Sequence, residues 1–88
     1  MYHYLVEFFG SLFFVYIILI TSNPIAIGFA LALVLILTKD ISGGYLNPAV
    51  TITMVIAGKL PSDELVLYCV AQILGGLFAL EAFKRTVQ

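Results

Sequence analysis

The chain has 88 residues, of which 62% are hydrophobic and 10% are charged. Soluble domains are usually about 45–50% apolar and about 25% charged, so this composition excludes a soluble domain and indicates a membrane protein. Four Lys and Arg residues against five Asp and Glu residues give a net charge of −1, which excludes nucleic acid as a partner because its recognition needs a basic surface.

The chain is poor in residues that carry chemistry. It has one histidine, His3, and one cysteine, Cys69. A structural zinc site needs about four ligands and a disulfide needs two cysteines, so we expect no metal, no other cofactor and no intrachain disulfide. A terminal histidine does not suit a catalytic triad inside a membrane, so we expect no enzyme activity and interpret Cys69 as a small packing residue.

The first apolar run covers residues 4–21, and its roughly 18 residues span about 27 Å as a helix, close to the hydrocarbon thickness of a bilayer. The run could be a cleavable signal. No Lys or Arg precedes it, however, and Glu7 interrupts its start, so we expect a retained transmembrane helix.

The second predicted span covers residues 24–38. Asn23 is a candidate N-cap and Pro24 suits the first helical position. Lys39 and Asp40 form a charged pair that belongs at the water interface, so we expect the span to close there.

The third predicted span covers residues 62–83. Ser62 is a candidate cap at its start, and Lys84 with Arg85 suits the negative end of the helix dipole. Glu81 stands four residues before Arg85, a spacing that predicts a weak local ion pair.

Residues 41–58 form an apolar segment that is broken in the middle by Gly43, Gly44 and Asn47–Pro48. The ten or so residues of helix from 48 to 57 would span about 15 Å, half a membrane. The alternative is a loop with a short surface helix outside the membrane, but the helical part is too apolar to favour it. The sequence therefore predicts an all-α membrane protein with three transmembrane helices and one re-entrant half-helix, in one unit of residues 1–88.

Residues 42–51 read Ser-Gly-Gly-Tyr-Leu-Asn-Pro-Ala-Val-Thr and resemble the first NPA box of the aquaporin and aquaglyceroporin family. Three further blocks resemble the first three helices of that family in the same order: Glu7–Gly10, Gly28–Ala30 and Ala71–Gly76. The resemblance covers almost the whole chain. Four blocks at the right separations are far more specific than an isolated Asn-Pro-Ala.

The resemblance implies a channel for water or small neutral solutes. The family fold has two inverted three-helix repeats that each give a half-helix to one pore, and this chain resembles only the first repeat. Lys39 and Lys59 on one side balance Lys84 and Arg85 on the other, so the charges set almost no preferred orientation in the bilayer. We therefore expect an antiparallel pair of identical chains, with a tetramer of such pairs implied by the resemblance. There are two alternatives: a different chain bearing the second repeat is the partner, or this chain is a fragment of a longer channel protein.

The expected pore residues are Asn47, Pro48 and Ala49. As an N-cap, Asn47 would keep its amide free to donate to a passing oxygen, while the positive helix ends repel cations and protons. The expected carbonyl ladder comprises Gly43, Gly44, Tyr45 and Leu46. The resemblance implies that Glu7 bonds the loop backbone, and a carboxylate within a span needs such a partner. An interfacial Glu7 is the alternative. Gln72 either steadies the same loop or bridges helices.

The chain departs from the family pattern at the expected constriction. The second repeat of the family carries an arginine directly after its NPA box, whereas Val50 follows Ala49 here. By position, Ile27 and, through pseudo-symmetry, Leu35 would form the rest of the filter. An apolar filter predicts slow water flux or a preference for less polar neutral solutes. Tyr45 also stands where the family commonly has histidine.

Two other classes of function remain open from the sequence. A proton-coupled transporter resembling the small multidrug family would also use a glutamate in its first span, but that family has four full spans and no Asn-Pro-Ala. A non-conducting membrane scaffold would need only helix packing, for which Ala71, Gly75 and Ala79 provide a ridge of small residues.

Overall fold

The computed structural model describes residues 2–86, and these contain helices and no strands. The elements are α1 (Tyr2–Ile20), α2 (Pro24–Ser42), the short helix α3 (Pro48–Ile56), the 3₁₀ turn η1 (Ser62–Glu64) and α4 (Leu65–Thr86). Three helical segments, with η1 and α4 taken together, are long and apolar enough to cross a bilayer. The prediction of an all-α membrane protein is confirmed.

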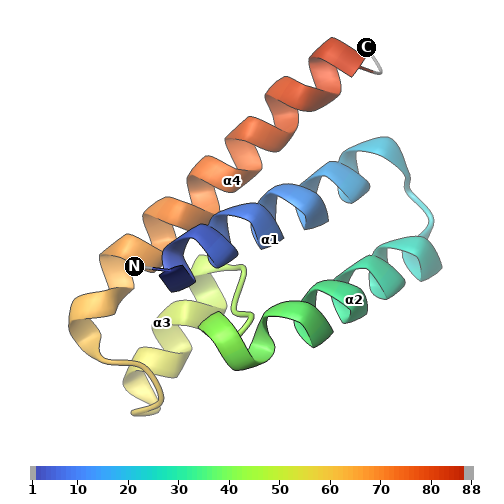
Figure 1. Cartoon of the computed structure of the whole chain (residues 1–88). Helices are drawn as coiled ribbons and strands as arrows, with labels where there is room; N and C mark the ends of the chain where they lie inside the picture. Colours follow the sequence, from blue (N-terminus) through green and yellow to red (C-terminus); the bar gives the residue numbers. More distant parts are fainter. Residues whose placement is uncertain (1, 87–88) are drawn as a thin grey trace.

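Of the three long helices, α1 lies between α2 and α4 (Figure 1). α1 packs against both α2 and α4, and α3 contacts α4. The beginning of α1, the end of α2 and the beginning of α4 lie at one end of the molecule, together with α3, whereas the end of α4 lies at the opposite end (Figure 1). Lys39 and Lys59 are therefore separated from Lys84 and Arg85 by the length of the helices.

Small residues allow α1 to approach its neighbours closely. A Cβ atom added at Gly75 of α4 would overlap the carbonyl oxygen of Phe8 and lie 3.1 Å from the amide nitrogen of Leu12. A Cβ at Gly10 would lie 2.8 Å from a side-chain carbon of Leu46. These contacts bring the backbones of α1, α4 and the segment after α2 together, as small residues do in membrane helix packing.

The same capping chemistry starts α2 and α3. The Asn23 side-chain oxygen accepts a hydrogen bond from the Ile25 amide at 2.8 Å, and the Asn47 oxygen accepts one from the Ala49 amide at 2.7 Å. Each asparagine is extended and is followed by proline at the first helical position. Both caps satisfy amides that have no partner inside the helix.

α2 is longer than the span expected from the sequence. It continues past Thr38 to Ser42, with Lys39 and Asp40 exposed on its last turns. Charged side chains at a helix end reach water without breaking the helix, so they did not stop it. The helix ends only at Gly43, whose φ of 94° is left-handed and whose amide bonds the Lys39 carbonyl at 3.1 Å.

Ser62 does not provide the expected side-chain cap of α4. The chain enters α4 through η1, which has no side-chain cap hydrogen bond. The Glu64 amide instead donates to the Pro61 carbonyl at 3.0 Å. A tight 3₁₀ turn therefore satisfies a backbone group that the serine was expected to satisfy.

Candidate functional site

A buried hydrogen-bond network is centred on Glu7 of α1, which is 0% exposed. One carboxylate oxygen accepts from the Ser42 hydroxyl at 2.6 Å and the Tyr45 amide at 3.2 Å. The other accepts from the Leu46 amide and the Gln72 side-chain nitrogen, both at 2.8 Å. Four donors compensate the cost of burying the carboxylate. The alternative of an interfacial Glu7 does not describe this arrangement.

Gln72 extends the network from α4 to α3. Its side-chain nitrogen also lies 2.8 Å from the Thr51 hydroxyl, which in turn donates to the Asn47 carbonyl at 2.8 Å. Gln72 and Thr51 are both buried. The structure combines the two roles left open for Gln72. Its side-chain nitrogen bonds the Glu7 carboxylate that holds the loop, and the same nitrogen connects α4 to Thr51 of α3.

Four successive amides of the loop between α2 and α3, those of residues 43–46, have acceptors within the protein. The Gly43 amide bonds the Lys39 carbonyl, and the Gly44 amide lies 3.4 Å from the Ser42 hydroxyl. The next two amides bond Glu7, as described above. These bonds satisfy the buried backbone donors of the loop and fix its path.

The loop carbonyls fall into two groups. The Ser42 carbonyl accepts from the Tyr68 hydroxyl at 2.7 Å, and the Leu46 carbonyl accepts from the Ser11 hydroxyl at 3.4 Å. Within residues 2–86, no hydrogen bond is donated to the three carbonyls between them, those of Gly43, Gly44 and Tyr45. Leu46 thus differs from the other three members of the expected ladder.

Positive φ angles give the loop its path. Gly43 and Gly44 have φ values of 94° and 64°, which glycine adopts without penalty. Leu46 has a φ of 59°, and it is the only non-glycine residue among residues 2–86 with a positive value. This conformation is costly for a leucine, so neighbouring contacts must hold it.

Asn47 presents its amide group at the start of α3. Its side-chain oxygen is used in the cap, whereas no hydrogen bond of the side-chain nitrogen is found within residues 2–86. The residue is exposed, as is Ala49, while Pro48 is half-buried between them. The three residues therefore combine a free N–H donor with the positive end of a nine-residue helix.

The sequence matches one protein family along its whole length. Residues 1–88 match the profile described as Major intrinsic protein. The chain belongs to the major intrinsic protein family. Together with the three candidate spans, membership makes it an integral, multi-pass membrane protein.

Several curated members of the major intrinsic protein family are similar to this chain. Glycerol uptake facilitator protein-like 6 of Lactiplantibacillus plantarum is 33% identical over 96% of the chain and 43% of the relative. Aquaporin Z of Brucella melitensis is 42% identical over 83% of the chain and 39% of the relative. Aquaporin-8 of Notomys alexis is 36% identical over 82% of the chain and 32% of the relative. The chain thus spans less than half the length of these relatives. No solved structure gives a significant match.

Two of the three constriction candidates of this family member, Ile27 and Leu35, lie apart in the single chain. Leu35 is close to the loop, because a Cβ at Gly44 would lie 2.9 Å from a Leu35 methyl carbon. Ile27 stands eight residues earlier on α2, about 12 Å along the helix axis. Val50 is 37% exposed on the first turn of α3. One chain does not bring them into one ring.

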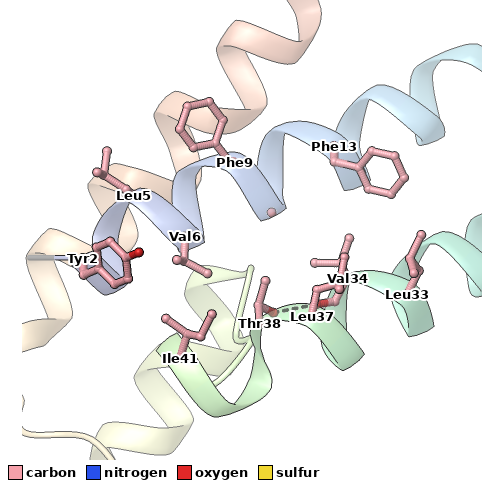
Figure 2. A pocket seen from close by; sticks show the side chains of 11 residues that line it. Tyr2, Leu5, Val6, Phe9, Phe13, Leu33, Val34, Leu37, Thr38 and Ile41 are labelled. Carbon is pink, nitrogen blue, oxygen red and sulfur yellow. Dashed lines mark hydrogen bonds between the residues drawn. The ribbon is translucent and has the colours of Figure 1, made fainter.

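An apolar groove with a volume of about 470 Å³ lies between α1 and α2. Figure 2 shows side chains of both helices lining it, among them Phe9, Phe13 and Leu37, with the loop and α3 behind. None of the expected pore or ladder residues lines the groove. It is an apolar face of two spans and does not belong to the Asn47 site.

Sequence reasoning assigned no role to four polar residues that complete the site: Ser11, Ser42, Thr51 and Tyr68. All are buried and all bond the loop or its neighbours. Polar side chains inside otherwise apolar membrane segments are costly unless partnered, and this signal could have found them. Their partners, however, come from other helices and are not encoded by local spacing.

A polar cluster lies near the beginning of α1 and α4. Glu64 accepts from the Tyr4 hydroxyl at 2.8 Å and lies 2.9 Å from the His3 ring nitrogen. Tyr68 packs edge-on against Tyr4 and connects this cluster to the Ser42 carbonyl. The cluster ties the two helix ends together at the end of the molecule that holds α3.

Proposed function

We propose that the chain is one half of a membrane channel for water or small neutral solutes, and that a second copy in inverted orientation completes the pore. The observation that carries this proposal is the Asn47 amide, which is exposed and unpaired at the start of α3 while the backbone behind it is fixed by buried Glu7. Curated relatives named aquaporin and glycerol uptake facilitator support the same class of function.

The length of α3 supports an incomplete pore. Nine helical residues span about 14 Å, whereas the hydrocarbon layer is about 30 Å thick. Non-helical backbone at membrane depth must face protein or water, so the free carbonyls of the loop need an aqueous path. An inverted copy would place a second α3 against the first and provide a path across the whole layer.

Charge balance supports insertion in both orientations. Lys39 belongs to the last turn of α2 and Lys59 follows the end of α3, whereas Lys84 and Arg85 belong to the last turn of α4. The ends of α2 and α4 lie at opposite ends of the molecule (Figure 1). Positive residues near the spans set orientation, and two against two leaves little bias. A single gene product could therefore supply both halves, and four such pairs could assemble as the family resemblance implies.

The proposed mechanism separates neutral solutes from ions. A permeating hydroxyl or water donates to the loop carbonyls and accepts from the Asn47 amide, which replaces hydrogen bonds lost to bulk water. The positive ends of two α3 helices meet near the bilayer centre and oppose the entry of cations and protons. These roles need no covalent step, so we propose a channel and not an enzyme.

The proposed constriction is apolar. Val50 takes the place next to Ala49 where the second repeat of the family carries an arginine, and Ile27 and Leu35 would contribute from the two copies. Water loses hydrogen bonds at such a wall. We therefore propose slow water flux, or a preference for less polar neutral solutes over water.

Val50 also favours a second arrangement, in which the two halves of the pore come from different chains. If the partner is a different chain with a second repeat, that chain would supply the arginine that Val50 does not. The function is then shared between two gene products, and this chain alone would conduct nothing.

Stopped-flow light scattering of proteoliposomes that hold only this chain tests the proposal. Osmotic water or glycerol flux above that of empty vesicles, without flux of protons into vesicles loaded with a pH dye, is the expected result. Uptake coupled to protons would support a transporter instead. No flux at all would contradict a pore made of this chain alone and support a scaffold or a different partner.

A further inference from the structure

The hydroxyl group of Ser11 behaves unlike the hydroxyls of three threonines in α2 and α3. Thr38, Thr51 and Thr53 each donate to the carbonyl four residues earlier in the chain. Ser and Thr inside helices commonly satisfy themselves in this way. Ser11 instead turns away from its own helix and donates to the Leu46 carbonyl, 35 residues away. The residue is 1% exposed, so this bond forms inside the protein.

One face of α1 holds the strained backbone of Leu46. Glu7 binds the Leu46 amide, Gly10 leaves room for the Leu46 side chain, and Ser11 binds the Leu46 carbonyl. These positions, three and four residues apart, lie on one face of a helix. The distance of 3.4 Å is long for a hydroxyl bond, so Ser11 fixes a direction more than it adds energy.

Tyr68 binds a backbone carbonyl at the other end of the loop. Its hydroxyl donates to the Ser42 carbonyl at 2.7 Å, and the residue is 3% exposed. Between these two bonded carbonyls lie three that accept no hydrogen bond from residues 2–86, those of Gly43, Gly44 and Tyr45. Two buried hydroxyls from α1 and α4 therefore bracket a run of free acceptors.

We propose that Ser11 and Tyr68 are positioning residues that limit the acceptor ladder of each copy to three carbonyls, those of Gly43, Gly44 and Tyr45. This inference rests on the proposed channel function. The Leu46 carbonyl is withdrawn from the path, so a permeating molecule passes directly from the Tyr45 acceptor to the Asn47 donor. An inverted pair then offers six acceptors and two donors, arranged symmetrically about the bilayer centre.

Solid-state NMR of the reconstituted chain tests this proposal at single carbonyls. The pairs Leu46–Asn47, Ser42–Gly43 and Gly44–Tyr45 each occur once in the sequence, so labelling the first residue with carbonyl ¹³C and the second with ¹⁵N in cell-free synthesis selects one carbonyl at a time. Ser11→Ala should move only the Leu46 signal upfield, and Tyr68→Phe only the Ser42 signal. Thr38→Val, which removes a buried hydroxyl bonded within its own helix, should move neither.

Water-edited spectra of the unaltered chain provide the second measurement. Gly44 should receive magnetisation from water, and Leu46 and Ser42 should receive much less. Two results would overturn the three-carbonyl ladder. One is a Leu46 carbonyl that receives as much magnetisation from water as that of Gly44, and the other is a Leu46 chemical shift that does not change in Ser11→Ala. If the Gly44 carbonyl received no magnetisation from water and the vesicles showed no osmotic flux, the proposed pore itself would be overturned. This would hold even if the carbonyl chemical shifts of both hydroxyl variants changed as expected.

Discussion

The side-chain nitrogen of Gln72 lies 2.8 Å from a carboxylate oxygen of Glu7 and joins residues 65 positions apart in the sequence. The same carboxylate oxygen binds the Leu46 amide, and the same nitrogen reaches Thr51. The loop and the start of α3 are therefore attached to α1 and α4 through one buried pair. The free amide of Asn47 depends on this attachment for its position.

Glu7→Gln should destabilise the fold and abolish flux. The substitution turns one acceptor oxygen into an amide donor that faces groups which themselves donate, so at least one buried donor loses its partner. The expected loss is about 2 kcal/mol or more in the free energy of unfolding, measured by SDS titration in mixed micelles. Glu81→Gln is the matched control. Its ion pair with Arg85 is exposed at 3.5 Å, so a loss comparable to that of Glu7→Gln would contradict the account.

Gly75→Ala should separate α1 from α4. The added carbon would overlap the Phe8 carbonyl oxygen and lie 3.1 Å from the Leu12 amide nitrogen, both in backbone that cannot move alone. We expect a loss of about 1–3 kcal/mol in the same unfolding measurement.

The neighbouring glycine provides the control for this substitution. A Cβ at Gly76 would lie 3.7 Å from a Val15 methyl carbon, which is ordinary contact. Gly76→Ala should therefore be tolerated. Equal effects of the two substitutions would show that close approach at Gly75 does not organise the helices.

Asn47→Asp should retain the helix cap but lose ion exclusion. Aspartate keeps an oxygen that can accept from the Ala49 amide, while it replaces the free donor with a negative charge at the proposed centre of the pore. Attraction of a few kcal/mol at short range would raise cation entry by about tenfold or more. Conductance in planar bilayers and proton flux in dye-loaded vesicles measure this change.

Asn23→Asp changes the same residue type at the cap of α2. Asn23 is exposed in the turn between α1 and α2, where it caps the Ile25 amide. Its substitution should leave cation and proton flux unchanged. Unaltered selectivity in Asn47→Asp, or altered selectivity in Asn23→Asp, would contradict the role assigned to the α3 terminus.

Much of the fold could be predicted from local sequence. Apolar runs of sufficient length predicted the long helices, and the two Asn-Pro pairs marked the starts of α2 and α3 because capping depends on residues next to each other. The end of α2 was misplaced at Thr38, since charges at an interface do not break a helix and only Gly43 could. The cap expected at Ser62 was likewise replaced by a backbone bond from Glu64 to Pro61.

The candidate site was only partly predictable. Asn47 and Glu7 carry recognisable signals, an N-cap and a carboxylate inside a span. The roles of Ser11 and Tyr68 depend on where α1 and α4 cross, which is set by close approach at Gly75 and not by spacing near either residue. How the expected constriction residues come together depends on a second chain and stays a prediction.

Removing the positive charges from one end of the chain should reduce the formation of inverted pairs in cells. Lys84→Gln with Arg85→Gln removes both positive side chains from one end and leaves Lys39 and Lys59 at the other, so insertion should favour a single orientation. Osmotic flux in spheroplasts expressing this variant should fall relative to the unaltered chain at equal protein levels. Undiminished flux would argue that orientation does not limit pore formation.

The orientation of the unaltered chain in a cell membrane tests the central claim most directly. In a Cys69→Ser background, single cysteines introduced at Ser62 and, separately, at the exposed Ser22 between α1 and α2 are treated with a membrane-impermeant maleimide before and after the membrane is opened. Neither position alters the charge balance. An inverted pair predicts that each cysteine is labelled from both sides in similar proportion. If the cysteine at Ser62 were labelled from one side only in every copy, and the cysteine at Ser22 only from the other, this chain could not form the pore with itself.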